Sequence, residues 1–144
     1  MSVESEIETG LRTAILAQLT TDGLTAAIRA SLLDDESGES AEIVEYPYVL
    51  IQATPFIPLW MQSPFGDVAV TLSVATHAAD DTKRTDLLAL YNSVRTVVDT
   101  VDLTSDVTSG SWKGLIVEEA DPVSIDGNNQ SITLYCQNRL CAVS

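Results

Sequence analysis

Residues 66–99 read GDVAVTLSVATHAADDTKRTDLLALYNSVRTVVD, and the hydrophobic pattern changes within this stretch from that of a strand to that of a helix. In the first half, apolar residues alternate with small or polar ones, which predicts a β-strand with one core face. These apolar residues are Val68, Val70, Leu72 and Val74. In the second half, apolar residues form one broad stripe, which predicts an amphipathic helix that covers one side of a sheet. They are Leu87, Leu88, Leu90, Tyr91, Val94, Val97, Val98 and Val101. Asp80 or Asp81 is the expected cap of this helix.

The residues before this stretch predict another strand over 43–53. Both of its faces are largely apolar: Val44, Tyr46, Tyr48 and Leu50 on one, and Ile43, Val49 and Ile51 on the other. A strand of this kind is covered on both sides. We expect it to pair antiparallel with the strand at 67–75, with helices on one side of the sheet and a partner subunit on the other.

The amino-terminal third predicts helical structure. Apolar residues recur every four positions at Ile7, Leu11, Ile15 and Leu19, which indicates an amphipathic helix ending near residues 20–23. The apolar residues of 24–33 suggest a second, short helix, and the acidic run at 34–40 predicts a surface loop. The spacing of that run does not match the ligand positions of an EF-hand.

The carboxy-terminal third predicts two closing strands, over 112–119 and 130–140. They are joined across Asp126-Gly127-Asn128-Asn129, whose residue types supply the positive φ angles that hairpin loops need. The expected fold is therefore α+β, with an antiparallel or mixed four-stranded sheet packed against an amphipathic helix and an amino-terminal helix. We expect one domain over 1–144, because this length suits one domain of ordinary size.

The composition opposes several functions. Seven Lys and Arg residues stand against 21 Asp and Glu residues, and the net charge of -14 disfavours binding to nucleic-acid phosphates and to anionic lipid surfaces. The amino terminus lacks the cationic and apolar segments of a secretory signal, and no apolar run approaches the length of a spanning helix. We expect a soluble protein made in a cytoplasm, without membrane association.

Cys136 and Cys141 both fall in the last predicted strand. Five positions apart, they face opposite sides and lie roughly 16 Å from each other along the strand, too far to form a disulfide. We expect free, buried thiols.

Reactive groups for catalysis are few. His77 is the single histidine, and a dyad with Asp80 or Asp81 would be needed for a small hydrolase or isomerase. No nucleophile elbow, Gly-rich phosphate loop, Cys-x-x-Cys pair or His pair at metal spacing accompanies it. We therefore expect no enzyme, no cofactor and no metal site, with His77 as a surface residue, and we keep the dyad as the alternative from a different functional class.

The segment from Pro55 to Gly66 is the strongest functional signal. Its three prolines, Pro55, Pro58 and Pro64, are typical of a surface loop. Its other side chains are of the types enriched at the centres of protein interfaces. The expected partner-contact residues are Phe56, Ile57, Leu59, Trp60, Met61 and Phe65. The alternative is that the segment folds back over its own sheet as a lid.

The order of features resembles the tail terminator, or tail-completion, proteins of tailed bacteriophages: an amino-terminal helix, EYPYVLIQA at 45–53, a loop with an aromatic residue, the stretch at 66–99 quoted above and two closing strands. This resemblance covers about two thirds of the chain. The resemblance implies a non-enzymatic virion protein of the neck that forms a hexameric ring, caps the assembled tail tube and ends its growth. Its implied partners are its own copies, the tube protein and a connector or sheath protein. DNA would pass through the acidic lumen without specific binding.

The segment at 55–65 is more apolar than the corresponding loop of that family, which leaves open whether it contacts the next subunit, the tube or a connector. Another neck component, such as a head-completion or stopper protein, is the alternative within the same structural class.

Overall fold

The computed structural model describes residues 3–29, 46–55, 57–58, 60–61, 65–108, 110–112, 114–127 and 129–142. These residues form two helices and one mixed sheet, and the fold class is α+β as predicted. The elements in chain order are α1 (Val3–Asp22), β1 (Ala27–Arg29), β2 (Tyr48–Ala53), β3 (Ile57–Pro58), β4 (Phe65–His77), α2 (Thr85–Thr100), β5 (Gly110–Ser111), β6 (Ile116–Ala120), β7 (Ser124–Asp126) and β8 (Asn129–Ala142).

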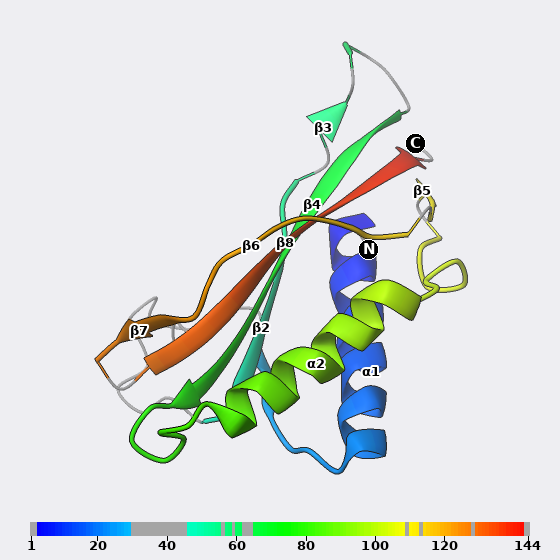
Figure 1. The fold of residues 1–144 in the computed structure, drawn as a ribbon. Helices are drawn as coiled ribbons and strands as arrows, with labels where there is room; N and C mark the ends of the chain where they lie inside the picture. The colour runs from blue at the N-terminus through cyan, green and yellow to red at the C-terminus, as the bar shows by residue number, and fades with distance from the viewer. Residues whose placement is uncertain are drawn as a thin grey trace, which may run out of the picture.

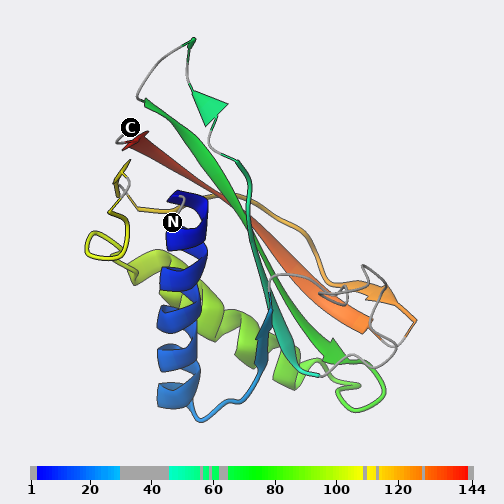
Figure 2. The same ribbon diagram turned by 180° about the vertical axis from the view of Figure 1, so that it is seen from behind.

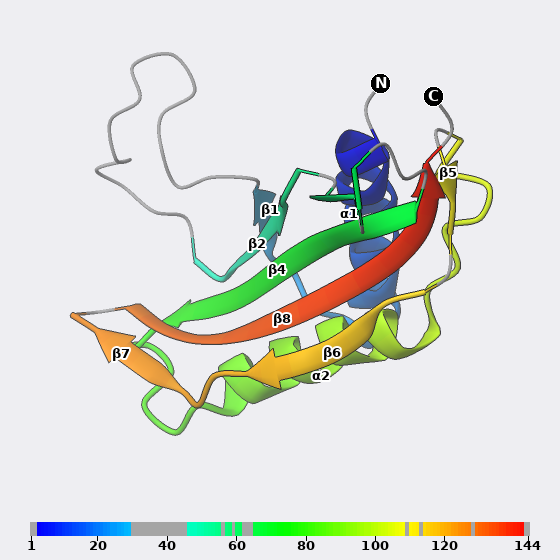
Figure 3. The ribbon, with the colours of Figure 1, turned by 90° about the horizontal axis from the view of Figure 1, so that it is seen from above.

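Two long antiparallel strands, β4 and β8, form the centre of the sheet. They pair without interruption from Phe65 opposite Cys141 to His77 opposite Asn129, and Figure 3 shows them curving side by side. β2 pairs antiparallel with the other edge of β4, and β1 extends the sheet as a parallel edge strand. The short strands β5, β6 and β7 all pair with the far edge of β8, whereas β3 pairs with the start of β4.

Both helices lie on the same face of this sheet (Figures 1 and 2). The alternation in β4 directs Val68, Val70, Leu72 and Val74 toward them, and all four are buried. Cross-strand neighbours continue the same apolar layer, since Leu72 lies between Ile51 of β2 and Leu134 of β8. The predicted coverage of one sheet face by the helix at 85–100 is confirmed, and α1 shares that task.

The sequence explains where α1 ends. Ile7, Leu11, Ile15 and Leu19 are all fully buried along one stripe, and the helix stops before Gly23, which has a positive φ of 72°. The Gly23 N–H donates to the Thr20 carbonyl at 3.2 Å and the Leu24 N–H to the Leu19 carbonyl at 2.8 Å, the pair of bonds that defines a Schellman motif.

The prediction of a short helix over 24–33 is wrong for its described part. Residues 27–29 form β1, whose Ala27 N–H donates to the Pro47 carbonyl at 3.0 Å. A short apolar run fits a strand as well as a helix. The Schellman turn places residues 27–29 beside the open edge of β2, whose backbone groups then pair with those of β1. Residues 30–33 and the acidic loop at 34–40 lie outside the described residues.

The sheet is also larger than the four strands expected, because β1 and β3 add to it and because three short strands, β5, β6 and β7, pair along β8 where one strand over 112–119 was predicted. A bulge between Val117 and Glu119 interrupts β6. The predicted hairpin turn is confirmed: Asp126 pairs with Asn129, and Gly127 has a φ of 61°. The strand predicted over 43–53 is observed from Tyr48, with residues 43–45 outside the described part of the chain.

The thiol of Cys136 is buried against the helices and makes no disulfide, as expected; burial raises its pKa to about 11. Cys141 pairs with Phe65 near the carboxy-terminal end of β8. Within the described ranges, neither helix is both long and apolar enough to cross a membrane.

Adjacent leucines in α2 allow a test of the helix–sheet packing. Leu87 is fully buried against the sheet, whereas Leu88 remains 46% exposed. We expect Leu87→Ala to lower the free energy of unfolding by about 2–5 kcal/mol, because it removes buried methyl groups and leaves a cavity. Leu88→Ala should cost less than about 1 kcal/mol. Urea denaturation followed by circular dichroism measures both, and equal losses would contradict the packing described here.

Candidate functional site

A polar cluster lies where β4 ends and α2 begins, at one end of the sheet. Asp81, Thr76 and Gln130 are all buried there. One Asp81 oxygen, Oδ2, accepts from the Leu87 backbone N–H at 2.9 Å, the Thr76 hydroxyl at 2.9 Å and the Gln130 amide at 3.1 Å. The other, Oδ1, accepts from the Asp86 N–H at 3.1 Å. Asp81 therefore caps α2, and it is one of the two aspartates, Asp80 and Asp81, that were predicted for this role.

This capping differs in detail from a usual N-cap. Arg84, in the left-handed region with φ 60°, occupies the N-cap position and makes no side-chain cap bond, so the carboxylate reaches the free N–H groups from three residues earlier. Burial raises the pKa of the Asp81 carboxyl. The hydrogen bonds from Asp86, Leu87, Thr76 and Gln130 outweigh that effect, and the net pKa lies below the ordinary 3.8 of an aspartate.

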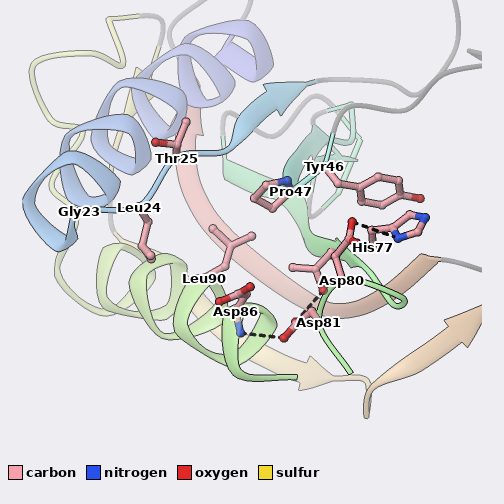
Figure 4. A pocket seen from close by; sticks show the side chains of 11 residues that line it. Gly23, Leu24, Thr25, Tyr46, Pro47, His77, Asp80, Asp81, Asp86 and Leu90 are labelled. Atoms are coloured by element: carbon pink, nitrogen blue, oxygen red, sulfur yellow. Dashed lines mark hydrogen bonds and ion pairs between the residues drawn. The ribbon is translucent and has the colours of Figure 1, made fainter. Parts of the chain in front are cut away.

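His77 lies beside this cluster and faces Asp80 (Figure 4). The distance from His77 Nδ1 to Asp80 Oδ2 is 3.4 Å, and Nδ1 makes no hydrogen bond among the described residues. The edge of the imidazole packs against Tyr46, with ring centroids 5.4 Å apart, and Tyr46 contacts Tyr48 in turn. His77 thus ends a row of three rings at the carboxy-terminal end of β4.

A pocket of about 300 Å³ opens between this row and the start of α2. Its lining includes Leu24, Pro47 and Leu90 besides the polar groups, and it contains no Ser or Cys among the described residues. The carboxylate of Asp81 binds the N–H groups of Asp86 and Leu87 at the start of α2. The carboxylate near His77 Nδ1 is that of Asp80, whose side chain is 87% exposed. This geometry provides a capped helix start beside a histidine and two tyrosines.

The apolar segment after β2 lies at the other end of the sheet, and its root is fixed. The Ala53 N–H donates to Glu8 of α1 at 2.8 Å, and the Thr54 N–H donates to the Ala69 carbonyl at 2.8 Å. The Ala69 N–H returns a bond to the Thr54 hydroxyl at 3.1 Å. We call residues 54–64 the apolar arm. Figure 1 shows β3, within this arm, beyond the end of β2 and away from both helices.

The described side chains of the arm are open to solvent. Ile57 is 63% exposed, Trp60 59% and Met61 88%, so these three do not form a lid over their own sheet. Phe56 and Leu59 lie outside the described residues, and Phe65 is described only through its backbone, at the start of β4. The structure thus brings Ile57, Trp60 and Met61 together on one projecting segment; that they contact a partner stays a prediction.

A second surface was only partly visible in the sequence. The sheet face opposite the helices is covered by no described helix. On this face, charged residues stand at Asp67 of β4 and at its register partner Arg139 of β8, and the positions from there toward Ser73 and Ser131 are uncharged. We call this uncharged part the open face: Leu50, Gln52, Ala69, Thr71, Ser73, Ser131, Thr133, Tyr135 and Gln137. Alternation in β4 predicted a small or polar face. Ile116 on β6, 69% exposed at the margin, is a functional candidate that sequence reasoning missed.

Asp81 also permits a test that depends on pH. Asp81→Asn should lower the free energy of unfolding by about 1–2 kcal/mol at pH 7. The NH₂ group of the asparagine would then face N–H and O–H groups that now donate to the carboxylate, and donors cannot bond to one another. The pKa of Asp81 is lowered in the folded state, so its contribution is present above pH 4 and is lost as the pH falls through the folded pKa. The free energy of unfolding of Asp81→Asn should therefore approach that of wild type below about pH 4.

The matched control for this substitution is Asp80→Asn, since Asp80 is exposed and adjacent. It should change stability by less than about 0.5 kcal/mol. Denaturant titrations of the three proteins at pH 7, 5 and 3 measure the effect. A loss from Asp81→Asn that is equally large at every pH would contradict the assignment of the carboxylate as the stabilising species.

No protein-family model matches this chain, and no curated protein matches it significantly. Among solved structures, a chain described as part of the "Virion of native gene transfer agent (GTA) particle" is similar, with a TM-score of 0.55 and 16% sequence identity. The similarity covers 92% of this chain and 95% of that chain. Nearly the whole of each molecule is therefore built on the same fold.

Proposed function

We propose that this chain is a structural protein of a phage-like virion, and specifically a tail terminator that forms a ring on the end of the tail tube. The observation that carries the proposal is the shared fold with a chain of a gene transfer agent virion over almost the full length of both molecules. The stretches at 45–53 and 66–99 that resemble the tail terminator family lie in the elements that build this fold, β2, β4 and α2.

The surface of the chain supports an assembly role. A tryptophan, an isoleucine and a methionine are exposed on one projecting arm, and exposed side chains of these types are enriched at protein–protein contacts. The prolines of the arm and the hydrogen bonds at its root reduce the conformational entropy that docking would cost.

The proposed mechanism is capping by shape. One side of the ring matches the end of the tube, so the ring occupies the position that the next ring of tube protein would take. Its other side offers no surface to which tube protein can add. The net charge of -14 per copy repels the phosphates of DNA, so a lumen lined by these subunits would let DNA pass without binding it. No catalytic step is needed for this role.

The arm provides the first test. Trp60→Ala should weaken self-association of the purified protein by about thirtyfold or more, because aromatic anchors at interface centres contribute about 2 kcal/mol or more. The control is Leu16→Ala, since Leu16 on α1 is 55% exposed, close to the 59% of Trp60. Sedimentation velocity and negative-stain electron microscopy should show rings for wild type and Leu16→Ala, and a shift to monomer for Trp60→Ala.

A wild-type protein that stays monomeric at micromolar concentration, or rings that fail to stop tube elongation in an assembly assay, would contradict the proposal. Rings that bind a head connector and not the tube end would assign the chain to another neck component.

Ionic strength gives an independent test of the acidic surface. Copies that each carry -14 repel one another, and salt shortens the range of that repulsion from about 30 Å at 0.01 M to about 8 Å at 0.15 M. We therefore expect the fraction of protein in rings to rise with salt over this range. A fall in that fraction would indicate that ion pairs, and not apolar contacts, hold the subunits together.

A further inference from the structure

The pocket beside His77 has no part in the ring proposed above, yet it has the form of a binding site. Its walls come from segments that are distant in sequence: the turn after α1, the residues before β2, the end of β4 and the start of α2 (Figure 4). Leu24, Pro47 and Leu90 give it apolar walls. Its volume of about 300 Å³ is at the lower end of the range for ligand pockets, so it suits a group as small as one side chain.

The charged groups that line this pocket are acidic. Asp80, Asp81 and Asp86 belong to the lining, and no Lys or Arg does. Lys83 and Arg84 are close in sequence, but among the described residues neither forms an ion pair with Asp80 or Asp86. The carboxylates of Asp80 and Asp86 are therefore not neutralised by a cation of their own chain.

The amino terminus of α2 reduces this negative charge only in part. A helix start carries about half a positive charge and commonly binds an anion. Here Asp81 is that anion, since its carboxylate accepts from the N–H groups of Asp86 and Leu87 at 3.1 and 2.9 Å. Three carboxylates against about half a positive charge leave a field that attracts cations and repels anions.

The walls of the pocket favour an organic cation. Among the residues that the structure describes, no group of three or more Asp, Glu, His or Cys side chains is placed to hold a metal ion. The ring of Tyr46 lines the pocket beside the imidazole of His77, with centroids 5.4 Å apart. Aromatic rings attract guanidinium more often than ammonium, because guanidinium is planar and less strongly hydrated. The aliphatic stem of an arginine can lie along the apolar walls.

Hydrogen bonding leads to the same ligand. Ionised carboxylates such as those of Asp80 and Asp86 only accept hydrogen bonds. The Thr76 hydroxyl, also in the lining, already donates its hydrogen to Asp81 at 2.9 Å. A guanidinium carries five N–H donors in a planar fork and no acceptor. Its donors therefore match the acceptors of this pocket.

We infer that this pocket receives the guanidinium of an arginine side chain presented by a partner protein of net positive charge. The carboxylates of Asp80 and Asp86 accept its N–H groups, and its plane lies against the ring of Tyr46. A second copy is a poor source of this arginine, because a chain of net charge -14 is repelled by the pocket. The inference does not depend on the proposed ring.

The first probe is the N-butylguanidinium ion, which has the head group and stem of an arginine. Added to ¹⁵N-labelled protein at constant ionic strength, it should shift the backbone amide signals of the pocket residues. The expected dissociation constant is about 1–20 mM, in keeping with a ligand of about eight heavy atoms. N-butylurea has nearly the same shape and no charge, and it should bind at least about tenfold more weakly. Equal binding of the two, or shifts spread evenly over the acidic surface, would overturn the inference.

Two variants remove the groups that recognise the probe. Asp80→Asn with Asp86→Asn should weaken binding about fivefold, because two exposed ionic contacts are lost. Tyr46→Leu keeps an apolar side chain, removes the aromatic ring and should weaken binding about threefold. The control for the first variant is Asp106→Asn with Glu119→Gln, which removes the same amount of charge from exposed positions outside the pocket.

The control variant should bind the probe as wild type does. All four acidic positions are exposed, so both double variants should keep the unfolding midpoint of wild type. Equal weakening in the two double variants would show that the probe responds to net charge alone, and that result would overturn the inference.

A peptide and a sedimentation experiment test where the arginine comes from. Acetyl-Gly-Arg-Gly-amide should shift the same amide signals as the probe, and its failure to do so would assign the pocket to a free guanidine instead of a side chain. Saturating butylguanidinium should leave any rings of the wild-type protein intact. Rings that dissociate with it, at constant ionic strength, would assign the arginine to a second copy and overturn the choice of partner.

These outcomes are separable from those of the proposed function. A protein that forms rings and terminates tubes but does not bind the probe would remove this inference alone. A protein that binds the probe in the pocket and forms no rings would support this inference and remove the proposed function.

Discussion

The pairing of β4 with β8 determines how every other part of this molecule is placed. Because side chains alternate along a strand, the register from Phe65–Cys141 to His77–Asn129 sends one set of residues toward the helices and the other set outward. A slip of one residue would move Val70 and Leu72 to solvent and carry the Ser and Thr side chains into the core. The same pair of strands also separates the two regions of interest, with the Asp81 cluster near His77 and the apolar arm near Phe65.

The two faces of this sheet have different physical roles. The inward face removes apolar area from water and stabilises the fold, and the Asp81 carboxylate holds α2 against that face by binding its free N–H groups. The outward face is not apolar enough for its exposure to water to be costly. It also carries too few charges for its burial to be strongly opposed. With 21 Asp and Glu residues against seven Lys and Arg residues, like charge would oppose contact between copies over most other surfaces.

Much of this architecture could be predicted from the sequence, because β4, α1 and α2 are long and strongly periodic. Residues 27–29 were misjudged because a short apolar run carries no period of its own, and the hydrogen bonds that make it a strand come from β2. The sequence limited the cap of α2 to Asp80 or Asp81, but the choice depends on Thr76 and on Gln130, which is 49 residues away. Ile116 could not be assigned to a face because the bulge that follows it resets the alternation of β6.

The proposed ring sets a physical requirement on any contact that the arm would make. Ile57, Trp60 and Met61 are exposed, and each copy carries a net charge of -14, which opposes the approach of another copy. In a closed ring, each added copy contributes one more contact of constant strength, while its charge is repelled by all the copies already present. The free energy of each contact must therefore exceed a repulsion that grows with the size of the ring. A rigid, uncharged contact with a buried aromatic anchor meets this requirement better than surface ion pairs do, since the net worth of such pairs is small and declines with salt.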